Sequence, residues 1–306
     1  MATQNNKQDI TFAELFSGIY HGKFIIILGT LASAILAVVV SLSLPNQYRS
    51  SATLIVNVDS NSKLASLAGG LGGLANIAGI NIGNSSDNSN PIVARELISS
   101  QGFILNFVDK HLMLVPMMAS KGWKVDSNEL INDEDIYDSS LNEWKIDENS
   151  NPLLRPRKED VVKRFKEIVR LSEDSKTGVL TLSVEFYSPY LAQEWLELLI
   201  AEVNNTIREY DIGQTSKNIE YLSSLIEETN NSNLHQVFYS LIEEQTKKLM
   251  LSKARIDYVF RTIDPPSVPE KKSKPARAVI CVLVTIAGSI IFTIIALVRY
   301  FANYNK

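Results

Sequence analysis

Four basic residues lie within one short stretch and form the densest group that could do chemistry through charge: Lys271, Lys272, Lys274 and Arg277. Lysine and arginine side chains bind phosphate oxygens through charge-assisted hydrogen bonds. The group could therefore bind phosphates at a membrane surface, and anchoring to ordinary lipid headgroups is the simpler interpretation.

Residue types that carry out catalysis or bind metals are scattered along the chain. His21, His111 and His235 lack metal-ligand spacing, and the single cysteine, Cys281, lies in an apolar stretch. The sequence has no Ser/His/Asp arrangement, nucleophile elbow or P-loop, and the acidic run 132–138 is typical of a solvated surface. We therefore expect no catalytic residue, no cofactor, no metal and no disulfide. The net charge of −4 gives no indication of a nucleic-acid partner.

Two uncharged apolar stretches, Phe24–Leu44 and Val279–Val298, flank most of the chain. Each matches the roughly 20 residues that a helix needs to cross a bilayer. The alternative for the first stretch is a cleaved signal peptide, but its apolar run is longer than such peptides use. Two spans place both tails on one side of the membrane, although the basic group at 271–277 leaves the orientation open.

Small residues recur at four-residue steps on both predicted spans. They are Gly29, Ser33, Ala37 and Ser41 on the first span, and Cys281, Thr285, Ser289 and Thr293 on the second. Such ridges allow membrane helices to approach closely, so we expect the two spans to pack together within one subunit or between neighbouring subunits. The alternative is that small residues are simply common in such helices.

Three segments between the spans predict strands: Tyr48–Val58, Val179–Phe186 and Ile256–Ile263. The second alternates apolar and polar residues with a period of two, as a half-buried strand does. The first and third lie close to a span along the chain, so we expect a sheet near the bilayer.

Four segments predict helices: Pro91–His111 as one or two helices, Arg157–Leu171, Pro189–Glu228 and Leu234–Arg255. Ser188 followed by Pro189 is a typical helix start, and the run Thr229–Asn233 predicts a break. The last two helices then form a long hairpin, which either projects from the sheet or folds back onto the core. We predict a solvated loop with short local structure over 123–151.

The segment Leu64–Gly83 has six glycines and no charge. Its glycines and asparagines make it a poor third span, and its match to a dinucleotide-loop pattern lacks a convincing strand–helix–strand context. We predict a partly apolar loop.

The segment before the second span carries the most specific motif, Pro266-x2-Pro269-x4-Lys274-Pro275-Ala276-x11-Gly288, with Pro265 directly before it. It resembles the proline-rich membrane-entry motif of the Wzz-type polysaccharide co-polymerases, the O-antigen chain-length determinants. The chain departs from the family at Lys274, where serine is usual, at Ala276, where lysine is usual, and at Phe292, where a second glycine is usual. The segments Ile10–Leu15, Gly22-Lys23 and Tyr48–Val58 agree with the family in layout.

The resemblance implies an α+β membrane protein with two transmembrane helices flanking a periplasmic α/β base domain that carries a long projecting helical hairpin. Its parts would be a cytoplasmic tail over 1–23, a transmembrane helix over 24–44, a periplasmic domain over 45–278 with extended helices at about 189–256, a second transmembrane helix over 279–298, and a cytoplasmic tail over 299–306. This implication decides the orientation that the charges leave open.

The resemblance also implies a function in the bacterial inner membrane. A ring-shaped homo-oligomer would set the modal length of a lipid-linked polysaccharide made by a Wzy-type polymerase, without catalysis of its own. The basic group could then meet inner-membrane lipids or a lipid-pyrophosphate carrier. Alternatives are an export partner for capsule or exopolysaccharide that works with a separate kinase or outer-membrane channel, a two-span sensory receptor, and a structural membrane scaffold. The tail Tyr300–Lys306 is too short to hold a receptor's signalling machinery.

Overall fold

The computed structural model describes residues 19–56, 91–145 and 156–304. The chain divides into two compact units. The first, here called the two-helix unit, comprises 1–47 and 272–306, and the second, the sheet-and-hairpin unit, comprises 48–271. The segment Leu64–Gly83 lies outside the described residues.

The two-helix unit consists mainly of α2 (Lys23–Ser43) and α11 (Arg277–Tyr304), which pack against each other. By length and composition both are candidate membrane spans. The short strand β9 (Lys272–Lys274) precedes α11. The second helix is longer than the predicted span, because it continues beyond Val298 through Arg299 and Tyr300.

The sheet-and-hairpin unit is built on antiparallel strands in the order β6-β7-β1-β8. Their bounds are β1 (Gln47–Val56), β6 (Val169–Glu173), β7 (Leu180–Phe186) and β8 (Phe260–Asp264). Ala52 lies opposite Leu182, and Leu54 lies opposite Leu180, so these apolar side chains share one face. That face forms the sheet's side of the core.

Helices cover this face of the sheet. They are α5 (Pro91–Ser99), α6 (Gln101–Lys110), α7 (Leu114–Ala119), α8 (Lys158–Ile168) and the start of α9 (Pro189–Glu228). Both α8 and α9 contact β7, and α6 and α7 contact α8. Large apolar side chains from all these layers are fully buried, among them Leu54, Ile104, Phe107, Met117, Phe165, Leu182, Phe186, Leu196 and Leu199. The core therefore lies between the sheet and this helical layer.

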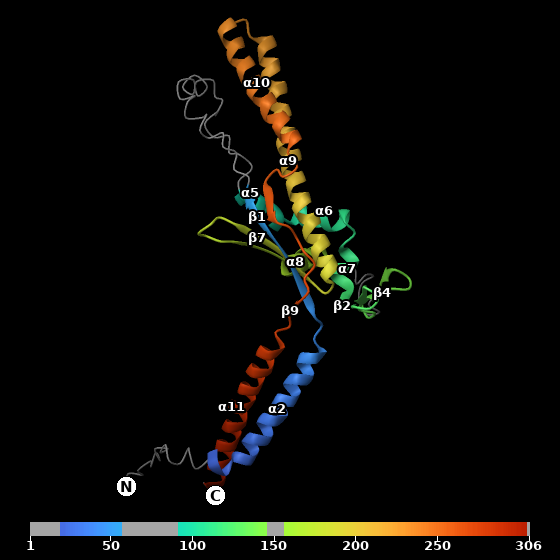
Figure 1. The fold of residues 1–306 in the computed structure, drawn as a ribbon, viewed down its shortest axis with the longest axis vertical. Coiled ribbons are helices and arrows are strands. Elements are labelled where there is room, and N and C mark those ends of the chain that lie inside the picture. Colours follow the sequence, from blue (N-terminus) through green and yellow to red (C-terminus); the bar gives the residue numbers. More distant parts are fainter. Residues whose placement is uncertain (1–18, 57–90, 146–155, 305–306) are drawn as a thin grey trace, which may run out of the picture. The chain divides into compact units, whose positions relative to one another are not determined.

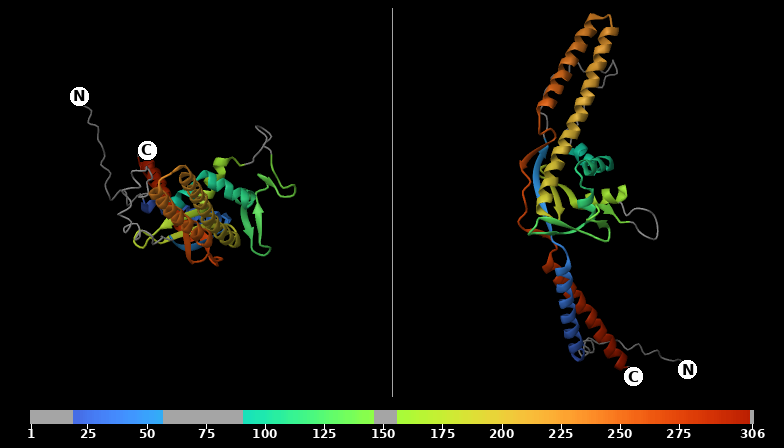
Figure 2. Two further views of the ribbon diagram at one scale, coloured as in Figure 1. Left: turned by 90° about the horizontal axis from the view of Figure 1, so that it is seen from above. Right: turned by 90° about the vertical axis from the view of Figure 1, so that its right-hand side faces the viewer.

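The longest helix, α9, starts and ends where local signals in the sequence indicate. The hydroxyl of Ser188 accepts a hydrogen bond from the backbone N–H of Leu191, and Pro189 occupies the first turn. After the break, α10 (Ser232–Ala254) begins behind Asn231, whose side chain accepts from the N–H of Asn233. The two helices pack together as an antiparallel pair (Figures 1 and 2).

Two small hairpins occupy part of the region predicted as a loop. One pairs β2 (Ser120–Lys124) with β3 (Glu129–Asn132), and the other pairs β4 (Tyr137–Asp138) with β5 (Glu143–Trp144). The expected short local structure is therefore made of strands. Residues 146–151 of the predicted loop lie outside the described residues.

Three further details differ from the sequence-based predictions. Val169–Leu171 belong to β6 and do not continue the preceding helix, because Val169 pairs with Val184 and Leu171 with Leu182. The third predicted strand begins at Phe260 instead of Ile256. Strand β7 is buried on both faces instead of one, since Glu185 is almost fully buried and lies 3.3 Å from the guanidinium of Arg49 on the neighbouring strand.

Candidate functional site

The contact between α2 and α11 depends on two glycines. A Cβ atom placed on Gly29 would overlap the ring of Phe292, and one placed on Gly288 would overlap the side chain of Ser33. The helices therefore approach so closely that neither position has room for a side chain. The pairing of Gly29 with Phe292 and of Ser33 with Gly288 also shows that the helices run antiparallel.

The structure places the predicted small residues differently on the two helices. On α2, Gly29, Ala37 and Ser41 are buried and Ser33 is half-buried. On α11, the most buried positions are Gly288 and Ala296, with Phe292 half-buried between them. The four predicted residues of α11, Cys281, Thr285, Ser289 and Thr293, are all half-buried beside them. The hydroxyls of Thr285 and Thr293 donate to backbone carbonyls four residues earlier in the helix.

Members of the basic group and their neighbours join the two chain segments of the two-helix unit. The Arg277 guanidinium donates to the side-chain oxygen of Asn46 at 3.1 Å, and the hydroxyl of Ser273 donates to the backbone carbonyl of Gln47 at 3.1 Å. Lys272 is exposed and Lys274 is half-buried. We call the contacts Asn46–Arg277 and Gln47–Ser273 the clasp, since they fasten the segment after α2 to the segment before α11.

The proline-rich motif is divided between the two units. Pro265, Pro266 and Pro269 belong to the sheet-and-hairpin unit together with the exposed Lys271, whereas Pro275 belongs to the two-helix unit. Next to the first three prolines, the carbonyl of Ser267 accepts a hydrogen bond from Ser50 at 2.8 Å. The carbonyl of Pro266 also accepts one from the side-chain amide of Gln193 at 3.4 Å. The first half of the motif is thereby fixed to β1 and α9.

A buried asparagine that sequence reasoning missed fastens β8 to α9. The side-chain oxygen of Asn204 accepts hydrogen bonds from the backbone N–H groups of Val259 and Phe260, both at 2.8 Å. Its amide donates to the carbonyl of Phe260 at 3.1 Å. One side chain thus satisfies three backbone groups in a segment where Val259 and Phe260 are completely buried.

Seven residues further along α9, about two helical turns, a second buried polar group joins the two helices of the hairpin. The phenol of Tyr258 donates to the carboxylate of Asp211 at 2.8 Å and lies 3.2 Å from the hydroxyl of Ser252 on α10. Thr215 is buried one helical turn beyond Asp211. The sequence did carry a signal for these buried polar residues. Asn204, Asp211 and Thr215 lie on the same face of the helix as the apolar Ile200 and Ile207.

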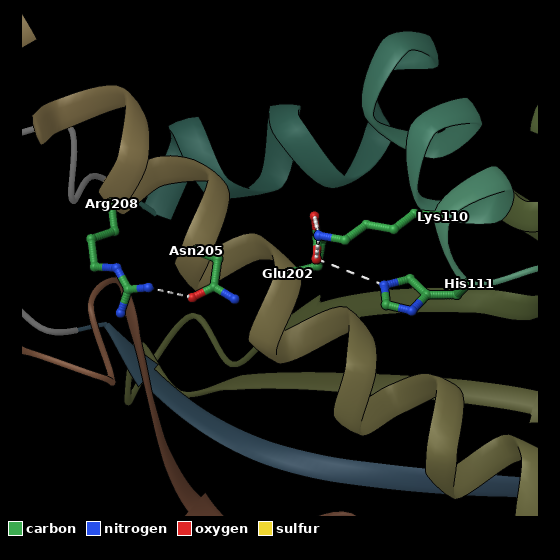
Figure 3. A network of polar contacts seen from close by, with 5 residues as sticks. All are labelled: Lys110, His111, Glu202, Asn205 and Arg208. Carbon is green, nitrogen blue, oxygen red and sulfur yellow. Dashed lines mark hydrogen bonds and ion pairs between the residues drawn. The ribbon is translucent and has the colours of Figure 1, made fainter. Parts of the chain in front are cut away.

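Figure 3 shows further polar contacts of α9, of which those of Glu202 lie toward α6 and those of Asn205 and Arg208 point away from it. The ammonium of Lys110 lies 2.9 Å from both carboxylate oxygens of Glu202, and Nε2 of His111 lies 3.7 Å from one of them. Arg208 donates to Asn205 at 2.8 Å and to the carbonyl of Arg255 at 3.3 Å. A hollow of about 230 Å³ adjoins Glu202 and is lined by Leu97, Gly102, Phe103, Asn106, Phe107 and Thr206.

Three aspartates in turns have a lowered pKa: Asp133 and Asp138, which are half-buried, and Asp174, which is exposed. The pKa of Asp138 is lowered because the Ser140 hydroxyl and the N–H groups of Leu141 and Ser140 donate to its carboxylate. Backbone hydrogen bonds lower the pKa of Asp133, with help from Lys121, and that of Asp174. Over residues 19–56, 91–145 and 156–304 no group of three or more His, Cys, Asp or Glu side chains could hold a metal ion.

Comparison with protein families gives one match. Residues 8–111 match the family model described as Wzz, chain length determinant protein. The resemblance predicted from the sequence is therefore confirmed over this part of the chain. A comparison with curated proteins finds no match.

Solved structures of co-polymerases align with the chain at low identity. A full-length bacterial polysaccharide co-polymerase is 13% identical over 96% of this chain and 99% of its own, with a TM-score of 0.39. A fragment of WzzB, the polysaccharide co-polymerase from Salmonella Typhimurium, is 14% identical over 74% and 99%, with a TM-score of 0.29. A mutant of the Shigella flexneri lipopolysaccharide O-antigen chain-length regulator is 10% identical over 74% and 100%, with a TM-score of 0.20.

Proposed function

We propose that this protein regulates the chain length of a bacterial surface polysaccharide and does so without catalysing polymerisation itself. The match of residues 8–111 to the chain-length determinant family carries the proposal. The two candidate spans agree with it, because they lie at the two ends of the described chain. The substrate of the regulated reaction is a lipid-linked O-antigen, and the polymerase is of the Wzy type.

The proposed arrangement is a two-pass inner-membrane protein with both termini in the cytoplasm and the sheet-and-hairpin unit in the periplasm. Several copies form a ring, in which α9 and α10 are lateral contact surfaces. Exposed Tyr210 and Tyr221 on α9 and exposed Tyr239 on α10 support this role, because tyrosine is enriched at protein interfaces.

Regulation would act through contact instead of chemistry. The close α2–α11 pair offers the polymerase a surface within the membrane, while the sheet-and-hairpin unit faces the growing glycan. The clasp supports the idea that movement of the sheet-and-hairpin unit is transmitted to the membrane helices. Along the chain, Asn46 lies between α2 and β1, and Ser273 lies between β8 and α11. The basic group, including Lys271 and Lys272, would contact phosphates of lipid or of the lipid-pyrophosphate carrier.

The lipopolysaccharide ladder of cells with and without the gene tests the proposal. We expect deletion to remove the modal cluster of bands and to leave a monotonic decay of intensity, and the wild-type gene on a plasmid should restore the cluster. An unaltered ladder would refute O-antigen control, and the sizing of capsule and exopolysaccharide would then test the alternative role in export.

Variants of the junction test whether it takes part. Lys272→Glu with Lys274→Glu reverses charge in the basic group, whereas Pro269→Ala changes the rigidity of the link and leaves the charges intact. A changed modal length in the first variant would implicate phosphate contact, and a change in the second would implicate rigidity. If both variants keep the wild-type modal length at normal abundance, the junction has no part in length control.

A further inference from the structure

Three aromatic side chains that are distant in sequence meet at one end of the sheet-and-hairpin unit. The ring centroid of Trp123 lies 5.7 Å from that of Tyr48 and 6.2 Å from that of Tyr190, with the planes steeply inclined in both pairs. Tyr48 comes from the beginning of β1, Trp123 from β2 and Tyr190 from the first turn of α9. We call these three residues the aromatic cluster.

The cluster is open to its surroundings. Tyr190 is 52% exposed, and Val125 in the adjoining β2–β3 turn is 70% exposed. The indole N–H of Trp123 donates to the side-chain oxygen of Asn128 at 2.9 Å, across a turn in which Asn128 has a positive φ of 54°. The only polar atom of the indole is therefore already satisfied, and the ring can leave water without losing a hydrogen bond.

The covalent chain limits how far the cluster can lie from α2. Only Leu44, Pro45, Asn46 and Gln47 separate Tyr48 from Ser43, the last residue of α2. Even a fully extended chain spans at most about 18 Å over these five steps. If α2 crosses the membrane, as the proposed function requires, the cluster lies close to the bilayer surface.

We propose that the aromatic cluster and the β2–β3 turn bind the interfacial layer of the bilayer. Trp and Tyr rings favour this layer, because it accommodates an apolar ring body beside polar groups. Trp123 and Val125 enter between the lipid headgroups, and Tyr190 lies at their level. This non-covalent contact holds the sheet-and-hairpin unit at the membrane surface, in addition to the covalent link from α2 to β1.

Charges around the turn are balanced, which determines the kind of lipid that is recognised. Lys124 lies opposite Glu129 in the strand pairing, Lys121 lies 3.3 Å from Asp133, and Asp126 adds a negative charge. A surface without excess positive charge gains little from anionic lipids. The contact therefore depends on burial of aromatic and apolar groups, and it forms equally well on zwitterionic lipid.

Tryptophan quenching by brominated lipids tests the contact directly. The full chain is placed in nanodiscs of phosphatidylcholine, with and without bromine on the acyl chains near the headgroup. The chain has three tryptophans, Trp123, Trp144 and Trp195. We expect Trp123→Phe to abolish most of the bromine-dependent quenching, and Val125→Glu to reduce it without changing the emission of buried Trp195. Trp144→Phe is the matched control and should retain the quenching by Trp123.

Equal quenching in the wild type and in Trp123→Phe would overturn the proposal. It would also be overturned if Trp123 is unquenched by lipid but changes its emission when purified polysaccharide is added, because the cluster would then be a glycan site. A requirement for anionic lipid would refute the apolar mechanism. The lipopolysaccharide ladder of the deletion strain tests the proposed function separately. If Trp123 is quenched but the ladder is unaltered, only the proposed function is refuted. If the modal cluster is lost but Trp123 is not quenched, only the membrane contact is refuted.

Discussion

The two units of this protein are stabilised by opposite kinds of packing. In the two-helix unit, small residues bring two helices together until Gly288 touches Ser33 and Gly29 touches Phe292. In the sheet-and-hairpin unit, large apolar side chains such as Phe107, Phe165 and Phe186 fill the space between helices and sheet. The glycine of α9, Gly213, is not at such a close contact, because no atom lies within 4 Å of a Cβ atom placed there.

If α2 and α11 cross the membrane, as proposed, the difference follows from the solvent around each unit. Between membrane helices, removing an apolar side chain from lipid brings no hydrophobic gain, so association depends on close fit. In water, each apolar area buried stabilises the fold, and large side chains contribute most. Buried polar groups in the second unit then need hydrogen-bond partners, as Asn204 has in Val259 and Phe260. The first unit should therefore be most sensitive to added volume, and the second to lost hydrogen bonds.

The largest effect is expected from Gly288→Leu. The side chain would overlap Ser33 near its own backbone, so the helices would have to separate. The native cysteine provides the measurement, because the antiparallel pairing of Gly29 with Phe292 and of Ser33 with Gly288 brings Ser41 level with Ile280, the residue directly before Cys281. We expect Ser41→Cys to form an intramolecular disulfide with Cys281 under mild oxidation in membranes, and Gly288→Leu to abolish it.

Two controls decide whether that loss reflects close fit. Val40→Cys, on an exposed position of α2, should not form the disulfide. Exchanging the paired residues, in Gly288→Ser with Ser33→Gly, keeps the total volume at the contact, so the disulfide between Ser41→Cys and Cys281 should still form. Unchanged cross-linking in Gly288→Leu would show that the helices do not depend on this contact.

The next effect concerns the polar group that fastens β8 to α9. Asn204→Ala leaves two buried N–H groups and one buried carbonyl without their partner, and we expect a loss of about 3–5 kcal/mol in the free energy of unfolding. Denaturation of the full chain in nanodiscs, followed by the emission of Trp195 beside Phe186, measures this loss. Asn205→Ala is the matched control, because among the described residues its oxygen accepts only from the half-exposed Arg208. Equal losses in the two variants would contradict the importance of the buried contacts.

Local signals predicted the long helices well. The capping pair Ser188–Pro189 and the break after Glu228 act on the backbone within a few residues, so they can be recognised without tertiary information. The sequence could not predict where α8 gives way to β6, because the apolar pattern continues through Val169. Pairing with Val184 on β7, a tertiary contact, decides the conformation there.

In the candidate site, too, some features follow from the local sequence and others are decided by tertiary contacts. On α2, Gly29, Ala37 and Ser41 are buried, whereas on α11 the contact runs through Gly288, Phe292 and Ala296, and the first two of these directly precede the predicted Ser289 and Thr293. The ring of Phe292 covers the glycine at position 29, where a Cβ atom would have no room. Asn204 and Asp211 were missed because a polar residue on an apolar stripe does not reveal its partner.

A smaller effect is expected at Lys110 and Glu202, which join α6 to α9. The side chain of Lys110 is 54% exposed, so water and salt screen its attraction to the carboxylate. A double-mutant cycle with Lys110→Met and Glu202→Gln should give a coupling of about 0.5–1 kcal/mol that declines as salt is added. A coupling as large as the loss predicted for Asn204→Ala would show that this surface pair, and not the buried amide, is the stronger link to α9.

The smallest effect is a local pH dependence in the β4–β5 hairpin. Because the Ser140 hydroxyl and the N–H groups of Leu141 and Ser140 lower the pKa of Asp138, the turn is stabilised while this carboxylate is charged. A lowered pKa in the folded state contributes stability above the ordinary value of 3.8, and that stability is lost as the pH falls through the lowered value. The emission of Trp144, whose ring lies 5.1 Å from that of Tyr137, should report this loss.

Two variants test the assignment to Asp138. Ser140→Ala removes the strongest donor and should move the transition to higher pH, whereas Asp138→Asn should abolish the transition. The same midpoint in the wild type and in Ser140→Ala would assign the transition to another group. Since the hydrogen-bond donors that lower the pKa of Asp138 all lie in its own turn, the change should stay within the hairpin and leave the emission of Trp195 in the core unaltered.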